Sequence, residues 1–199
     1  MLRWLRDRRR RRILAGPFPE AWRRILEERV PFHATLAPEE RARLEGILRV
    51  IVFEKNWEGC GGLVLDEEMK VVVAAQAALL ILEIEHDYYR GVDSVYIYPS
   101  TFVLPEGRAH RGIVIEGETP VLGLAHHRGP IVLAWDAARH GARNPEDGRN
   151  VVFHEFAHQL DLLDDYADGT PVLDTPEHYR TWVRIMTEEH EALVRAAED

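Results

Sequence analysis

The sequence predicts an α+β fold, and three features along its 199 residues carry that prediction. Two segments near the N-terminus each begin with a proline followed directly by an acidic residue, which is a common opening of a helix. Short runs of β-branched and aromatic residues occupy the middle of the chain. An apolar segment with two histidines four residues apart comes after them. N-terminal helices, a small mixed β-sheet and a further helix together make a layered α+β domain.

Three helices are expected before the sheet. The first two cover residues 19–28 and 38–52, and each has its proline in the first turn. The third begins after Asp66, a residue type favoured as an N-cap, and continues to about residue 84. Gln76 and Glu83 alone interrupt its apolar run from residue 71 onward. We therefore expect this helix to be buried on most sides.

Four short strands are expected, at residues 94–98, 101–104, 111–115 and 131–135. Gly129 and Pro130 precede the last of them, and because proline cannot donate to a strand ladder, this strand is predicted to lie at the edge of the sheet. An exposed edge can pair with an extended peptide through backbone hydrogen bonds. Residues 59–62 are expected to form a turn, and His140 is expected to lie in a polar surface loop.

The pattern with the clearest chemistry is His154-Glu155-Phe156-Ala157-His158. Residues four apart lie on one face of a helix, so both imidazoles point the same way and can share one metal ion. Imidazole nitrogens suit zinc, which in catalytic sites keeps one position open for water. The sequence therefore predicts that His154 and His158 bind a single Zn²⁺ ion.

Glu155 follows the first predicted ligand and stays within reach of a water molecule on the metal. A metal ion lowers the pKa of such a water to about 7, and a carboxylate can take its proton and pass it to a leaving amine. Asn150 is the expected N-cap of the helix, and apolar residues fill its other faces. Buried imidazole and carboxylate groups are costly without a partner, which favours a metal site over a solvated stripe. The implied reaction is acyl transfer to water.

Four blocks of sequence stand out along the chain: Trp57-Glu58-Gly59-Cys60-Gly61-Gly62-Leu63 with Asp66-Glu67-Glu68-Met69-Lys70 and Ala74-Ala75-Gln76-Ala77; Tyr96-Ile97-Tyr98-Pro99-Ser100; Gly129-Pro130-Ile131-Val132-Leu133-Ala134-Trp135-Asp136; and Asn150 to Asp161. In this order they resemble the Mlc titration factor A family over most of residues 29 to 183. That resemblance implies a zincin-like fold, a bacterial zinc peptidase of aminopeptidase type, a peptide substrate and binding to a transcriptional repressor, the glucose repressor Mlc.

The resemblance also implies a third zinc ligand, a glutamate on a later helix in a stretch similar to Asp-Pro-Tyr-Ala-Ala-x-x-Pro-Ala-Glu-Phe-Phe. No such stretch occurs in the 199 residues, so the domain is expected to be C-terminally incomplete or to use another ligand. Asp161 shares the helix face of the two histidines and is expected to orient an imidazole rather than to bind the metal. Four glutamates could substitute for it but are better explained as a helix start and a solvated surface: Glu177, Glu188, Glu189 and Glu191.

Charge separates a basic N-terminal arm, residues 1–16, from a single zincin-like domain predicted for residues 17–199. Seven arginines and one aspartate give residues 1–12 a charge of +6, so the net −9 of the chain leaves −15 for the remainder. The acidic remainder and the lack of a nucleic-acid motif argue against a direct nucleic-acid partner. The arm could contact anionic lipid or nucleic acid, or rest on the acidic body as a surface helix.

The longest apolar run is too short and too interrupted for a transmembrane segment. Cys60 is the only cysteine, so an internal disulfide is impossible and a cytoplasmic location is expected. Two functions of different class follow. The first is a zinc peptidase that uses His154, His158 and Glu155. The second is a catalytically impaired regulatory protein that keeps the zincin-like scaffold and binds a partner.

Overall fold

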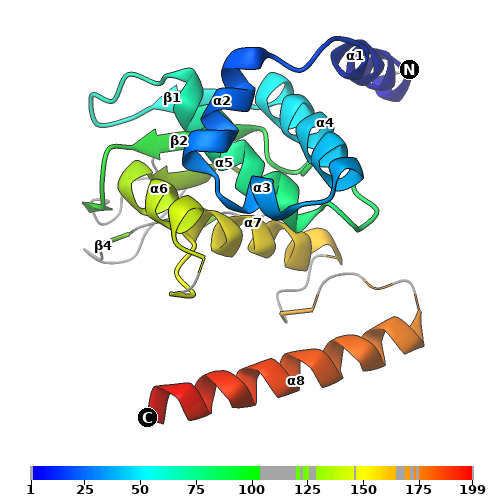
Figure 1. The fold of residues 1–199 in the computed structure, drawn as a ribbon, viewed down its shortest axis with the longest axis vertical. Coiled ribbons are helices and arrows are strands. Elements are labelled where there is room, and N and C mark those ends of the chain that lie inside the picture. The colour runs from blue at the N-terminus through cyan, green and yellow to red at the C-terminus, as the bar shows by residue number, and fades with distance from the viewer. Residues whose placement is uncertain are drawn as a thin grey trace. The chain divides into compact units, whose positions relative to one another are not determined.

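The structure is a computed structural model that describes residues 2–103, 120–121, 123–125, 129–145, 147–164, 169–170, 173 and 175–198 (Figure 1). The chain divides into two compact units, Met1–Leu160 and Asp161–Asp199. The elements are α1 (Leu2–Ala15), α2 (Glu20–Arg29), α3 (Phe32–Thr35), α4 (Pro38–Glu54), β1 (Asn56–Gly59), α5 (Glu67–Leu80), β2 (Ser94–Tyr98), β3 (Phe102–Val103), β4 (Pro120–Val121), β5 (Gly123–Ala125), β6 (Ile131–Ala134), α6 (Trp135–Arg143), α7 (Val151–Asp161), a 3₁₀ turn (Leu162–Asp164) and α8 (Pro176–Glu198).

The larger sheet has the strand order β1-β2-β6-β5. Strands β1, β2 and β6 are parallel, whereas β5 runs antiparallel to β6 with Leu124 opposite Val132. The sheet is therefore mixed, and the predicted α+β class is confirmed. The predicted edge position of β6 is wrong, because β5 pairs with its outer side. Strand β5 has only three residues, one of them a glycine, which is too short for the sequence pattern to predict a strand.

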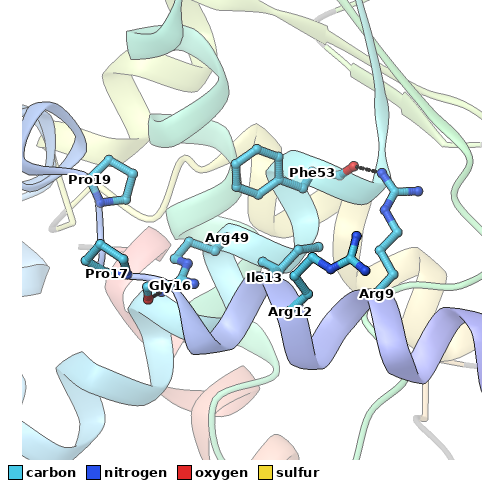
Figure 2. Close-up of a pocket in the computed structure, with 8 residues that line it drawn as sticks. All are labelled: Arg9, Arg12, Ile13, Gly16, Pro17, Pro19, Arg49 and Phe53. Carbon is cyan, nitrogen blue, oxygen red and sulfur yellow. Dashed lines mark hydrogen bonds between the residues drawn. The ribbon is translucent and has the colours of Figure 1, made fainter.

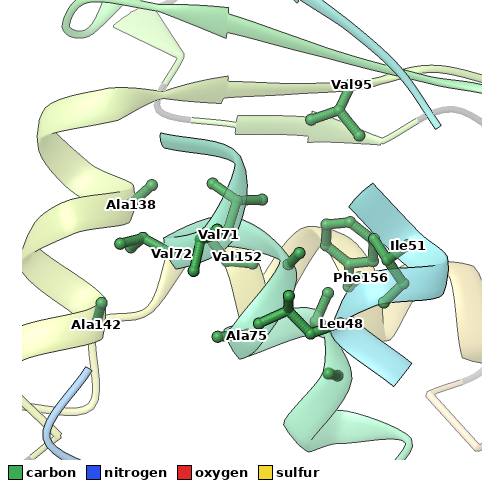
Figure 3. Close-up of a cluster of buried hydrophobic side chains, with 14 of the residues drawn as sticks. Leu48, Ile51, Val71, Val72, Ala75, Val95, Ala138, Ala142, Val152 and Phe156 are labelled. Atoms are coloured by element: carbon green, nitrogen blue, oxygen red, sulfur yellow. The ribbon is translucent and has the colours of Figure 1, made fainter. Parts of the chain in front are cut away.

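Helix α5 is the centre of the larger unit (Figure 3). All residues from Val71 to Ala78 are buried, as expected for a helix that is apolar on every side. It packs against α4, α2 and α6. Val152 and Phe156 of α7 join the same core as Leu48 and Ile51 of α4. The helix that carries the histidines is thereby fastened to the core through the face opposite them.

The expected helices at residues 19–28, 38–52 and 67 onward correspond to α2, α4 and α5, with α5 ending at Leu80 rather than near residue 84. Strands β2 and β6 were also predicted, and β3 lies within the second expected run, residues 101–104. The strand predicted at residues 111–115 lies outside the described residues. The turn expected at residues 59–62 follows β1, a strand that the sequence did not indicate.

Helix α6 corrects the prediction that His140 lies in a loop. Its charged residues and Gly141 suggested irregular structure, but Ala138, Gly141 and Ala142 form one buried face of a helix. Close packing against neighbouring backbone, rather than helix propensity, explains the small residues. His140 itself is exposed, and its Nε2 lies 2.7 Å from the Asp147 carboxylate.

The basic arm forms helix α1, which packs against α4. Its inner face contains Arg10, whose guanidinium donates to both carboxylate oxygens of Glu54 at 2.8 Å and also pairs with Asp87. The same guanidinium lies 4.4 Å from the ring centroid of Tyr88. Arg10 is buried, so these acids and this ring compensate for the loss of water around its charge.

The smaller unit contains α8, whose first turn is capped by Thr175. The Thr175 hydroxyl accepts a hydrogen bond from the backbone N–H of His178 at 3.1 Å. Arg184 and Glu188 form an exposed ion pair one turn apart on this helix. A helix start at this position was expected from the sequence. Among the helices in the described ranges, none is long and apolar enough to cross a membrane.

Burial of Lys55 makes a first testable prediction. Its Nζ donates to the carbonyl of Tyr89 at 2.7 Å, and burial lowers the pKa of Lys55 from 10.5 to about 8. Between these two pH values the unfolded chain holds a proton that the folded chain has released, so the free energy of unfolding should rise with pH by up to about 3 kcal/mol. Urea denaturation across this range should show that rise.

Lys55→Met is the matched control, because it keeps the length of the side chain and removes the titrating group. The Tyr89 carbonyl also accepts from the backbone N–H of Val92 at 2.9 Å, so the substitution leaves it satisfied. The difference in unfolding free energy between wild type and Lys55→Met should grow in favour of wild type as the pH increases. A difference that does not change between these pH values would contradict the lowered pKa.

Candidate metal centre

Helix α7 begins with the predicted cap. The Asn150 side-chain oxygen accepts a hydrogen bond from the backbone N–H of Phe153 at 2.9 Å, and its backbone carbonyl accepts from His154 at 3.0 Å. Asn150 therefore satisfies N–H groups that have no partner within the first turn. This cap determines where the first turn starts, and so the direction in which His154 and Glu155 leave the helix.

The same asparagine joins α7 to two other helices. Its Nδ2 donates to the side-chain amide oxygen Oε1 of Gln76 on α5 at 2.8 Å and to the Gly141 backbone carbonyl of α6 at 3.2 Å. Gln76 is fully buried, and its own Nε2 donates to Ala138 of α6 at 3.2 Å and to Val72 at 3.0 Å. The Gln76 bonds to Val72 and Ala138 are buried and those of Asn150 are partly buried, so an unsatisfied amide in this network would be costly.

Gly141 makes the approach of α6 to α7 possible. A Cβ atom built at Gly141 would lie 2.9 Å from the Asn150 Cγ and 3.1 Å from the carbonyl oxygen of Arg149. These distances are too short for nonbonded carbon, so any larger residue must push the start of α7 away from α6. The glycine is needed for close packing at this point.

His154 and His158 lie together on the exposed side of α7. Their ring centroids are 4.6 Å apart, and their Nε2 atoms face each other at 3.2 Å. Two imidazoles bound to one tetrahedral zinc ion, with Zn–N distances of about 2.0 to 2.1 Å, would have their nitrogens roughly 3.3 to 3.4 Å apart. The pair thus already has the separation that a shared zinc ion requires, and the donor chemistry fits zinc.

The first histidine of the pair is shifted toward its neutral form. Partial burial lowers the pKa of His154, and the nearby His158 lowers it further. A neutral imidazole offers a free lone pair on one nitrogen, which is the form that binds a metal ion. The local environment therefore favours the binding form of His154.

Glu155 follows His154 directly on α7 and is only 5% exposed. Strand β5 passes directly over it: a Cβ atom at Gly123 would lie 2.5 Å from the Glu155 Oε1 and 2.6 Å from a methyl group of Val151. Phe156, the next residue, stacks edge-on against Tyr89 with centroids 4.8 Å apart. The glutamate is thus held between the sheet and the core, next to the two exposed imidazoles.

The remaining predicted residues are distributed as follows. Asp161 is the last residue of α7, and its carboxylate accepts a hydrogen bond from the backbone N–H of Gly169 at 2.8 Å. The glutamates weighed as substitute ligands lie on α8. Within the residues that the structure describes, no three His, Cys, Asp or Glu side chains form a group able to hold a metal ion.

The sequence reasoning missed the residues that hold the site together. Gln76 was visible as an isolated polar residue in an apolar run, which is a signal for a buried hydrogen bond. Nothing in the sequence indicated that Gly123 and Gly141 matter for packing, because a glycine in a short strand or near a helix end is usually explained by the backbone conformation it allows. Their close approach to Glu155 and Asn150 exists only in three dimensions.

A substitution at Gln76 tests the network. Gln76→Met keeps the volume but leaves the Asn150 amide without its acceptor on α5, and should lower the free energy of unfolding by about 2 kcal/mol. Lys70→Met on the same helix, at a half-buried position, is the control and should change it by less than about 0.5 kcal/mol. Equal effects of the two changes in urea denaturation would show that the network contributes no particular stability.

Comparison with known proteins gives consistent matches. The family model described as glucose-regulated metallo-peptidase M90 matches residues 4–199. An uncharacterized protein of Synechocystis is 36% identical over 198 residues, which are 98% of this chain and 72% of that protein. Mlc titration factor A of Yersinia enterocolitica is 32% identical over 152 residues, 75% of this chain and 55% of its own length. The corresponding Yersinia pestis protein is 31% identical over 144 residues, which are 71% of this chain and 53% of that protein. The chain thus spans about half the length of the Mlc titration factors that it matches.

Proposed function

Since the chain belongs to the glucose-regulated metallo-peptidase M90 family, we propose that it is a zinc-dependent peptidase that hydrolyses peptide bonds at the N-terminus of its substrates. Membership confirms the family resemblance and supports the zincin-like assignment made from the sequence. The observation that carries the proposal is the pair of facing imidazole nitrogens, 3.2 Å apart, beside a buried glutamate.

His154 and His158 would hold the ion. When bound, zinc polarises a carbonyl group and makes a water molecule acidic enough to lose a proton near neutral pH. Glu155 is proposed to accept a proton from the attacking water and to donate it to the leaving amine. Its burial under β5 restricts its side chain, so the carboxylate stays in one place during both transfers. Asp161, one turn beyond His158, is proposed to orient an imidazole.

Strand β5 is proposed to align the substrate. It is at the end of the strand order among the described strands, so the edge that the sequence reasoning assigned to β6 belongs to β5 instead. An extended peptide that adds to this edge would form backbone hydrogen bonds beside Gly123. Because Gly123 is in contact with Glu155, the peptide would lie within reach of the carboxylate.

A regulatory binding protein is the second candidate. The name Mlc titration factor A, carried by several relatives, supports binding of a transcriptional repressor, and the proposed compartment is the cytoplasm. The absence of a three-residue metal group among the described side chains favours this candidate over an efficient enzyme. In this case the zincin-like scaffold would present a surface without turnover.

Metal analysis combined with an aminopeptidase assay distinguishes the two candidates. We expect one zinc ion per chain, lost in His154→Ala and His158→Ala, and we expect Glu155→Gln to retain zinc while lowering kcat by about 10² to 10⁴-fold. Substitution of the exposed His190 on α8 by alanine is the control and should change neither. Absence of zinc, together with intact binding of an Mlc-type repressor, would eliminate the peptidase and leave the binding protein.

Gly123→Ala tests the role of β5 separately from the metal. The added methyl group must displace Glu155 or the strand, since it would lie 2.5 Å from the carboxylate oxygen. Displacement of a catalytic group by about 1 Å can lower the rate roughly 10²-fold. We expect kcat to decrease while zinc content stays at the wild-type level. Unchanged peptidase activity would mean that this contact does not position Glu155.

A further inference from the structure

A pocket of about 400 Å³ opens between α1, the turn after it and α4, and neither histidine of the candidate site lines it (Figure 2). Ile13, Pro17, Pro19 and the ring of Phe53 give it an apolar lining. Three arginines also line it: Arg9, Arg12 and Arg49. An apolar cavity beside several guanidinium groups suits a ligand that has both an anionic and an apolar part.

The three arginines of this pocket form no ion pair with a described carboxylate. None of the ion pairs formed within the described ranges includes Arg9, Arg12 or Arg49. Arg49 is only 7% exposed, and its Nη1 donates to the Gly16 carbonyl at 2.8 Å. A carbonyl neutralises no charge, and a buried cation without an anion is costly. An anionic ligand would remove that cost.

Arg9 has donors left for such a ligand. One nitrogen donates to the Phe53 carbonyl at 2.6 Å, which holds the side chain at the pocket wall, as Figure 2 shows. A guanidinium has five N–H groups in a fork that matches the oxygens of a phosphate. Arg12, three residues further along α1, lies on the same wall.

Other residues of α1, outside the pocket lining, form a separate stripe of cationic and aromatic side chains. Trp4, Arg8 and Arg11 follow at helical spacing, and the Arg8 guanidinium lies 5.5 Å from the Trp4 ring. Trp4 is 55% exposed and Leu5 51%. The inner face of the helix differs, because there Arg10 is satisfied by Glu54 and Asp87. The inner face of α1 thus carries a paired arginine, whereas its outer face carries arginines together with exposed apolar side chains.

We propose that this outer face of α1, together with the pocket at its C-terminal end, binds the surface of a bilayer containing anionic phospholipid. Arg9 and Arg12 hold the headgroup phosphate of one lipid, whose glycerol and first chain carbons lie against Ile13, Pro17 and Phe53. Trp4 and Leu5 insert at the level of the headgroups, where amphipathic side chains are favoured. Arg8 and Arg11 are attracted by the negative surface potential.

Lipid fits these groups better than nucleic acid does. A phosphate backbone would satisfy the arginines but would leave the apolar pocket lining and the exposed Leu5 without a partner. The remaining chain carries −15, which repels any polyanion large enough to reach beyond α1. A bilayer can contact α1 without approaching the acidic remainder of the chain, because charges are screened beyond about 8 Å at physiological salt.

Vesicle flotation with the full chain tests the proposal. We expect binding to vesicles of phosphatidylcholine with phosphatidylglycerol, no binding to phosphatidylcholine alone, and a loss of binding as NaCl increases. Arg9→Gln/Arg12→Gln and Arg8→Gln/Arg11→Gln should each weaken binding roughly 25-fold, because each arginine near the surface contributes about a factor of five. Trp4→Ala/Leu5→Ala should also weaken it, which a purely electrostatic contact would not show.

Arg24→Gln/Arg139→Gln is the matched control. Both residues are exposed and lie on α2 and α6, so the pair removes the same charge elsewhere and should leave binding within about a factor of two of wild type. Short-chain phosphatidylglycerol, but not inorganic phosphate, should protect the pocket arginines from phenylglyoxal. Binding to neutral vesicles, equal losses in the control pair, or tighter binding to duplex DNA than to anionic vesicles would each overturn the proposal. None of these measurements depends on peptidase activity.

Discussion

The hydrogen bond between Gln76 and Asn150 is the contact on which the geometry of the site depends. It joins the buried centre of α5 to the cap of α7, and the same two side chains reach α6 through Ala138 and Gly141. Three helices are thereby tied at one point in the core. Gln76 is fully buried and Asn150 is half-buried, so loss of a partner in this network is costly and the start of α7 has little freedom to shift.

The opposite face of α7 is held by apolar packing instead. Phe156 is fully buried and meets Tyr89, whose hydroxyl donates to the Ala77 carbonyl of α5 at 2.8 Å. Polar bonds thus determine where the helix begins, and the aromatic pair determines its rotation about its own axis. Both constraints leave the two histidines on the accessible side, and β5 then covers Glu155. A metal site needs this combination of fixed ligands and an open position.

The arginines of α1 divide into two sets. Those on the inner face form ion pairs with acidic residues, and those on the outer face form none with the residues that the structure describes. Arg10 lies among acids and an aromatic ring, which anchors a strongly basic helix to an acidic body. Arg9, Arg12 and Arg49 surround an apolar pocket with no carboxylate partner in the described ranges. The sequence showed only that residues 1–12 are basic and that the remainder of the chain is acidic. The division of the arginines between an anchor and a binding face required the helix to be placed.

The spacing of residues within one helix was enough to predict the candidate ligands, because residues four apart lie on the same helix face. The N-cap at Asn150 and the buried α5 were predictable for the same local reason. The sequence did not predict three other features: the pairing of β5 with β6, the helix around His140 and the approach of Gly123 to Glu155. Each depends on segments that are distant in sequence or too short to show a periodic pattern. The sequence alone therefore indicated which side chains are candidate metal ligands. Tertiary packing decided what covers the glutamate beside them and which strand edge is available, because close contact between backbones leaves no periodic pattern in the residues that make it.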